Sequence, residues 1–145
     1  MKNLIFLVAF FAALSLSVAA QSKAKLAKFA DQVSIAYQNG KLASLDSKSI
    51  RRGKIHLTLE YTGGEIEFEY KSFTSFKTLA HWLKKNEYQD GLPFRVAWPL
   101  TGCRKGSCKF FLDGGILHNH DYLTKLDYGY QNKKLYVRRI RLLIG

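Results

Sequence analysis

Residues 55–70 read IHLTLEYTGGEIEFEY, a pattern that predicts a β-hairpin. Apolar and polar residues alternate on both sides of Gly63-Gly64, as they do in two β-strands that each bury one face. A two-residue turn at these glycines predicts a hairpin with three apolar cross-strand pairs on one face. The predicted pairs are Tyr61 with Ile66, Leu59 with Phe68 and Leu57 with Tyr70. The other face is then acidic, because the glutamates of the second strand share it.

Helical patterns lie on both sides of this hairpin. Residues 22–38 carry apolar side chains at three- and four-residue spacing, and Asn39-Gly40 ends the helix. Residues 41–49 predict one or two short helical turns. Ser72 or Thr74 is expected to cap a second helix that runs to Lys85. The two apolar stripes are Leu26, Phe29, Ala30, Val33 and Ala36, and Phe76, Leu79, Ala80 and Leu83.

Strand patterns fill the rest of the chain, at residues 94–98, 108–112 and in a long final hairpin of residues 122–144. A tight turn at Asn132 starts a simple register that would set Leu126 against Arg139. One extra residue at Arg138-Arg139 sets Leu126 against Ile140 instead, and this predicts a β-bulge. The other expected pairs are Tyr130 with Leu135, Tyr128 with Val137, Thr124 with Leu142 and Tyr122 with Ile144.

The order of these elements resembles the cone-shaped fold of the nuclear transport factor 2 and ketosteroid isomerase superfamily. The hairpin of residues 55–70, the helix of residues 74–85 and the strand pair of residues 122–144 carry the resemblance. It implies an α+β fold in which N-terminal helices pack on a strongly curved antiparallel sheet of about six strands, with a pocket at the open end. A cystatin-like helix-on-sheet fold is the alternative. Isomerases of this superfamily use a carboxylate base and a tyrosine or protonated acid as oxyanion donors, and no such set is matched to positions here.

The first twenty residues have the pattern of a cleavable signal peptide. Lys2 gives a positive start, an apolar run extends from Leu4 to Leu14, and small residues at positions 18–20 precede Gln21. The run is shorter than the roughly 20 residues that cross a bilayer, so no transmembrane segment is expected in the mature chain. Residues 21–145 are then expected to form a single domain of a periplasmic or secreted protein.

Cys103 and Cys108 enclose four residues, Arg-Lys-Gly-Ser. An exported protein meets an oxidising compartment, so a structural disulfide is expected. A redox pair would more typically enclose two residues at a helix start, and a zinc site would need two further ligands nearby. No metal and no cofactor are expected.

The chain is strongly basic, with a formal net charge of +12. Such a field attracts lipid head groups, acidic polysaccharide or nucleic acid, and it also keeps a protein soluble. The strand bases expected to meet an anionic partner, such as an envelope surface, are Lys125, Arg138, Arg139 and Arg141. The expected pairing turns most tyrosines of the final hairpin toward the core. The bases then lack aromatic stacking platforms, and export also takes the chain away from intracellular nucleic acid, so nucleic acid is not the expected partner.

Histidines offer the candidate catalytic site. His118 and His120 would share one face of a strand and, with Tyr122, could form the centre of a small pocket enzyme of isomerase or hydrolase type. The alternative is a turn with exposed histidines. His81 is adjacent to Trp82 on the second helix and is expected at the surface, because neighbours in a helix do not share a face.

The sequence favours an exported, non-catalytic binding domain over an enzyme. Its pocket or its outer sheet face would bind a small apolar ligand, another protein or an anionic surface, and the sheet could also pair two protomers. The pocket enzyme that uses His118 and His120 is the alternative function.

Overall fold

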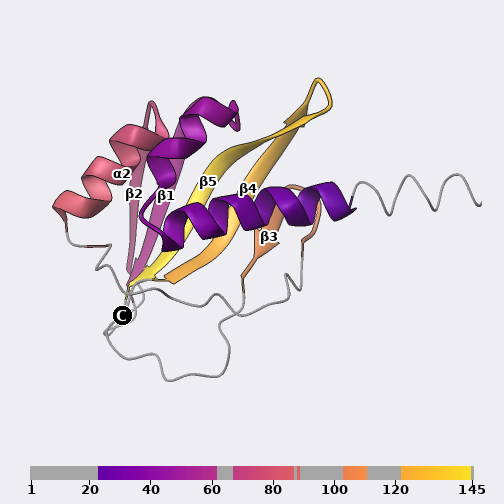
Figure 1. Ribbon diagram of the computed structural model, residues 1–145. Helices are drawn as coiled ribbons and strands as arrows, with labels where there is room; N and C mark the ends of the chain where they lie inside the picture. The colour runs from indigo at the N-terminus through magenta and orange to yellow at the C-terminus, as the bar shows by residue number, and fades with distance from the viewer. Residues whose placement is uncertain (1–22, 62–66, 87, 89–102, 111–121, 145) are drawn as a thin grey trace, which may run out of the picture.

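A mixed sheet with helices packed on one face makes up the fold, which the computed structural model describes for residues 23–61, 67–86, 88, 103–110 and 122–144. Within these residues the sheet has five strands in the order β2-β1-β5-β4-β3. Figure 1 shows the strands as one twisted layer with the helices in front of it. The fold is therefore α+β. Its strands are β1 (Arg51–Tyr61), β2 (Glu67–Phe73), β3 (Ser107–Lys109), β4 (Tyr122–Gln131) and β5 (Lys134–Ile144).

The centre of the sheet differs from the expected all-antiparallel arrangement. β1 pairs with β2 antiparallel but with β5 parallel, and β4 is antiparallel to both β5 and β3. A parallel pair needs a long crossover between its strands, and the chain between β1 and β5 contains all the other strands and a helix. The prediction of about six antiparallel strands is wrong in this respect, although the strand expected at residues 94–98 lies outside the described residues.

The helices bury the apolar stripes that the sequence predicts. Residues 23–38 form the first helix, and Phe29, Ala30 and Val33 on it are buried. A 3₁₀-helix, η1 (Leu42–Lys48), follows with Leu42 and Leu45 fully buried. α2 (Phe76–Lys85) follows β2 and buries Phe76, Leu79 and Leu83, with Ala80 partly buried. All of these side chains join the strand residues in one core between the helices and the sheet.

The start of α2 differs from the prediction, which placed its cap at Ser72 or Thr74. Ser75 is the N-cap, since its Oγ accepts the Thr78 backbone N–H at 3.0 Å, and Thr78 Oγ1 in turn accepts the Ser75 N–H at 3.2 Å. This is a capping box. The predicted caps are wrong because β2 continues to Phe73, which keeps Ser72 within the sheet.

The hairpin of β1 and β2 has a register that differs by one residue from the predicted one. Leu59 lies opposite Glu69, Thr58 opposite Tyr70 and Glu60 opposite Phe68, so the three expected apolar pairs are wrong. A one-residue shift moves every side chain of a strand to the other face. Phe68 and Tyr70 consequently lie on the face away from the helices, with 47% and 65% of their surface exposed.

An edge strand tolerates this shift because its inward positions remain close to water. The inward positions of β2 are Glu67, which is exposed, and Glu69, Lys71 and Phe73, which are partly exposed. Long polar side chains can lay their methylene groups on apolar neighbours and keep the charged end in water. The core is closed instead by β5, η1 and α2, whose apolar residues fill it.

The final hairpin confirms the predicted β-bulge. Asp127 pairs with Arg139 and Tyr128 with Val137, which leaves Arg138 as the extra residue, and Leu126 pairs with Ile140 as expected. A second irregularity, between Leu123 and Lys125, was not predicted. It sets Leu123 opposite Leu142 and Tyr122 opposite Leu143, so the expected pairs Thr124–Leu142 and Tyr122–Ile144 are wrong. The second shift turns Leu123 into the core, where it is buried.

The two cysteines lie at disulfide distance, as the sequence predicts. Their Cα atoms are 4.0 Å apart across a tight turn, and within that turn Arg104 and Ser107 exchange backbone hydrogen bonds of 2.8 and 3.0 Å. Cys108 is fully buried, so the disulfide ties the turn to the core.

Reducing this disulfide should lower the free energy of unfolding by about 2 kcal/mol, because the reduced unfolded chain gains the freedom of the opened loop. Urea unfolding with and without reductant measures the loss. The Cys103→Ala/Cys108→Ala variant is the control, since reductant should not change its midpoint. Equal midpoints for the oxidised and reduced protein would contradict the prediction.

Candidate functional site

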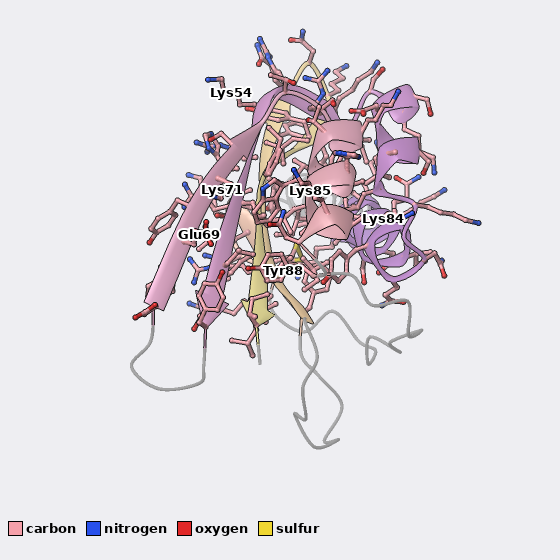
Figure 2. The ribbon with its side chains drawn as sticks, turned by 90° about the vertical axis from the view of Figure 1, so that its left-hand side faces the viewer. Lys54, Glu69, Lys71, Lys84, Lys85 and Tyr88 are labelled. Carbon is pink, nitrogen blue, oxygen red and sulfur yellow. A yellow bond between two sulfur atoms is a disulfide. The ribbon has the colours of Figure 1, made fainter. Side chains whose placement is uncertain are left out.

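The sheet face that looks away from the helices is the candidate site, termed the open face. Directly paired residues of neighbouring strands point to the same side of a sheet. The register therefore assigns side chains to this face, opposite to core residues such as Leu57 and Leu59. In Figure 2 the helices lie on one side of the sheet, and no described helix covers the other. The open face consists of Phe68, Tyr70, Ser72, His56, Thr58, Glu60, Arg139, Arg141, Leu143, Lys125, Asp127, Ser107 and Lys109.

Basic side chains form a row across the open face. The register sets Arg141 beside Lys125, and Lys125 beside Lys109, on three adjacent strands. On its other side Arg141 is paired with Thr58, which is paired with Tyr70. Strands lie about 4.8 Å apart, so the row of three bases spans about 10 Å, and the line across the sheet from Tyr70 to Lys109 spans about 19 Å. Like charges directly opposite each other destabilise a sheet, so folding stability does not account for the row.

The acidic residues of the open face neutralise only part of this charge. Asp127 forms an ion pair with Lys125, with 3.4 Å between the carboxylate oxygen and Nζ. Glu60 lies beside Phe68 and Leu143. Within the described part of the chain, neither Arg139 nor Arg141 forms an ion pair. Their charge is therefore available to a partner.

In the centre of the open face, two polar atoms have no hydrogen-bond partner within the described part of the chain. They are Thr58 Oγ1 and Arg141 Nε, and both are buried. Buried polar atoms in native proteins are nearly always paired, and an unpaired one needs an explanation. Because Thr58 and Arg141 are cross-strand neighbours, both unpaired atoms belong to the same part of the open face.

Aromatic rings lie at one end of the row. Phe68 and Tyr70 have ring centroids 6.4 Å apart and ring planes that differ by 22°. Both rings belong to β2, which forms one edge of the sheet. Their exposure adds an apolar, stackable surface to a face that is otherwise basic and polar.

A second cluster of polar groups lies on the other side of β2, next to α2, where Figure 2 labels Glu69, Lys71 and Tyr88. The Tyr61 hydroxyl donates to Glu69 Oε2 at 2.9 Å, and the Tyr88 hydroxyl, also at 2.9 Å, then donates to the Tyr61 oxygen. Lys71 forms an ion pair with Glu69, and its Nζ lies 5.6 Å from the ring centroid of Trp82.

The ionisation of this cluster follows from its contacts. Burial, together with the hydrogen bonds to Tyr88 and Glu69, raises the pKa of Tyr61 far above its ordinary value. The hydrogen bonds from Lys71 and then from Tyr61 lower the pKa of Glu69. Glu69 is therefore a carboxylate at neutral pH and both tyrosines use their protons inside the cluster. Neither tyrosine has a proton left for a ligand, and the cluster closes the edge of the core.

The structure brings together three of the four bases that the sequence selects. Lys125, Arg139 and Arg141 share the open face, and Arg138 is the exposed extra residue of the β-bulge. Sequence reasoning missed Phe68 and Tyr70, which it placed in the core. The available signal was the choice between a two-residue and a longer turn at Gly63-Gly64, because that choice decides which residues of β2 face inward.

The tyrosines of the final hairpin are less buried than expected. Tyr128 is partly buried and its hydroxyl donates to the Arg104 carbonyl at 3.1 Å. Tyr130 lies on the core-facing side of the hairpin as predicted, but it is 64% exposed and so does not join the core. It lies at the turn end of the hairpin and pairs with Leu135. The end of a long hairpin extends beyond the helices that bury its base, as Figure 1 shows.

The side chains of the predicted catalytic residues are not among those that the structure describes. His118 and His120 lie outside the described residues, and so does the side chain of Tyr122. His56 lies on the open face with Nδ1 2.9 Å from Ser72 Oγ, and His81 is exposed on α2, as predicted. In the described part of the chain no three His, Cys, Asp or Glu side chains are grouped to hold a metal ion.

Comparisons with known proteins identify no relative. No family model matches the chain, and no curated protein or solved structure is significantly similar to it. Among the helices that the structure describes, none is long and apolar enough to span a membrane. Within the described residues, the open face is therefore the feature that bears on function.

Proposed function

We propose that this chain is an exported, non-catalytic binding domain that holds an anionic partner on the open face. The observation that carries the proposal is the row of Arg141, Lys125 and Lys109 on adjacent strands, with Arg139 beside it. Export rests on the signal-peptide pattern of residues 1–20.

Arginine is suited to this role because its planar guanidinium binds phosphate, sulfate and carboxylate groups through two parallel hydrogen bonds. Arg139 and Arg141 have no acidic partner among the described residues, and an anionic ligand would relieve the repulsion among neighbouring bases. The net charge, +12 for the full chain and +11 without residues 1–20, would also speed the encounter with a polyanion at low salt.

Kinship with the nuclear transport factor 2 superfamily belongs to the same proposal, and the α+β layers are compatible with it. A pocket enzyme that uses His118 and His120 is the alternative. It depends on residues outside the described part of the chain and stays a prediction.

Retention on heparin tests the proposal. The Arg139→Gln/Arg141→Gln variant should elute at clearly lower salt than the unchanged protein, because two charges of the open face are lost. The matched control is Lys84→Gln/Lys85→Gln, which removes the same charge from exposed positions of α2 on the helix side (Figure 2). The control should elute close to the unchanged protein. Equal shifts for both variants would show that retention follows net charge alone and would overturn the proposal.

A further inference from the structure

We infer that the anionic partner of the open face is a single-stranded nucleic acid, with its phosphates on the arginine and lysine row and its bases stacked on Phe68 and Tyr70. The inference rests on the proposed function, because it names the polyanion that the same face would hold.

Aromatic rings distinguish this polyanion from others. Sulfated polysaccharides and lipid head groups bind a basic face mainly through their charged groups, whereas each nucleotide of a single strand presents a flat base beside its phosphate. Phe68 and Tyr70 are large apolar side chains left 47% and 65% exposed, and their planes differ by only 22°. Bases stack on such rings without regard to sequence, which is how basic grooves with aromatic platforms bind single strands.

The sequence argues against this partner because it places the tyrosines of the final hairpin toward the core and because it predicts export, so the single strand would be one met outside the cytoplasm. The observed register of β2 removes the first objection. It brings two rings from a different strand onto the same face as the bases.

The arrangement of charges also suggests how a strand would lie. From Tyr70 a line across the sheet passes through Thr58 and then along the basic row of Arg141, Lys125 and Lys109. Glu60 lies opposite Phe68 and would repel a phosphate there. Bases would therefore lie over β2, while the phosphates follow the row toward β3. At the usual strand spacing the three bases span about 10 Å and the line from Tyr70 to Lys109 about 19 Å, room for a few nucleotides.

Arg141 is the centre of this arrangement. It stands between Thr58 and Lys125, and no described acidic group pairs with it. Its Nε is buried and has no partner among the described residues. A phosphate would therefore be held by the terminal Nη groups of the guanidinium, in the bidentate geometry.

Fluorescence anisotropy tests the inference with three probes: an oligothymidylate of about ten nucleotides, an abasic deoxyribose-phosphate chain of the same length, and heparin. The oligothymidylate should bind more tightly than the abasic chain. The Phe68→Ala/Tyr70→Ala variant should lose about 5- to 150-fold in affinity for oligothymidylate per stacked base, with its affinity for the abasic chain unchanged.

Salt dependence separates stacking from charge. The Arg139→Gln/Arg141→Gln variant should reduce the slope of log affinity against log salt by about 1.4, from about 0.7 for each lost phosphate contact to a single strand. The Phe68→Ala/Tyr70→Ala variant should keep the slope. Tyr130→Ala is the matched aromatic control, since Tyr130 is 64% exposed but not on the open face, and it should bind as the unchanged protein does.

Two outcomes overturn the inference in distinguishable ways. If both chains bind equally and the Phe68→Ala/Tyr70→Ala variant is unaltered, while Arg139→Gln/Arg141→Gln still weakens heparin binding, the face holds a polyanion through charge alone. The proposed function then stands and the nucleic acid is wrong. If neither pair of substitutions changes binding to any probe, both the inference and the proposed function are wrong.

Discussion

Replacing Leu59 with alanine should lower the free energy of unfolding by about 2–5 kcal/mol, whereas replacing Phe68 with alanine should change it by about 0.5 kcal/mol or less. Leu59 is fully buried in the core, and its removal leaves a cavity that the neighbours fill only in part. Phe68 is 47% exposed on an edge strand and faces away from that core.

This pair of variants distinguishes the observed register of the β1–β2 hairpin from the register predicted for a two-residue turn. In the register of a two-residue turn, Leu59 and Phe68 would lie opposite each other in the core and both replacements would cost several kcal/mol. Urea unfolding of both variants gives the comparison, and Tyr70→Ala is a second exposed control at 65% exposure. Similar large losses for Leu59→Ala and Phe68→Ala would contradict the register described here.

Replacing Asp46 with alanine should lower the free energy of unfolding by about 2–3 kcal/mol. The Asp46 carboxylate in η1 accepts the backbone N–H groups of Phe76 and Lys77, each at 2.9 Å. These are unpaired donors at the start of α2, where the helix dipole also favours a negative charge. Arg51 Nε lies 3.3 Å from the same carboxylate. Hydrogen bonds to a charged group at a helix start are stronger than those between neutral groups.

Two further variants separate the contribution of the Asp46 charge from that of the Ser75 cap. Asp46→Asn keeps one acceptor oxygen but loses the charge, so its loss should be smaller than that of Asp46→Ala. Ser75→Ala removes only the local cap and should cost about 1 kcal/mol. The unfolding midpoint in urea and the helical circular dichroism signal provide the measurements. An Asp46→Ala variant within about 0.5 kcal/mol of the unchanged protein would show that the contact from η1 does not hold the helix.

Local patterns predicted those parts of the molecule in which neighbours along the chain decide the structure. The stripe of Phe29, Ala30 and Val33 predicts a buried helix face because the helical period is a local property. The bulge at Arg138 was predictable for a similar reason. A short turn at Asn132 sets the register nearby, and only one extra residue keeps Leu126 against Ile140.

The sequence alone predicted the basic residues of the candidate site but not its aromatic residues. Lys125, Arg139 and Arg141 could be selected because alternation along a strand separates them from the apolar positions. Phe68 and Tyr70 could not, since their face depends on a register that differs by one residue. An apolar residue predicts burial only when the core has room for it, and here β5 and the helices fill that room.

Period, composition and short spacing are enough to predict the α+β class, most of the described helices and strands, the cysteine pair and the excess of basic charge. The parallel pairing of β5 with β1, and the cap that Asp46 gives to a helix thirty residues further along the chain, come from the tertiary structure. It alone also placed two aromatic rings on the basic face. These features depend on contacts between distant segments, and such contacts are chosen by the packing of the whole core rather than by any one stretch of chain.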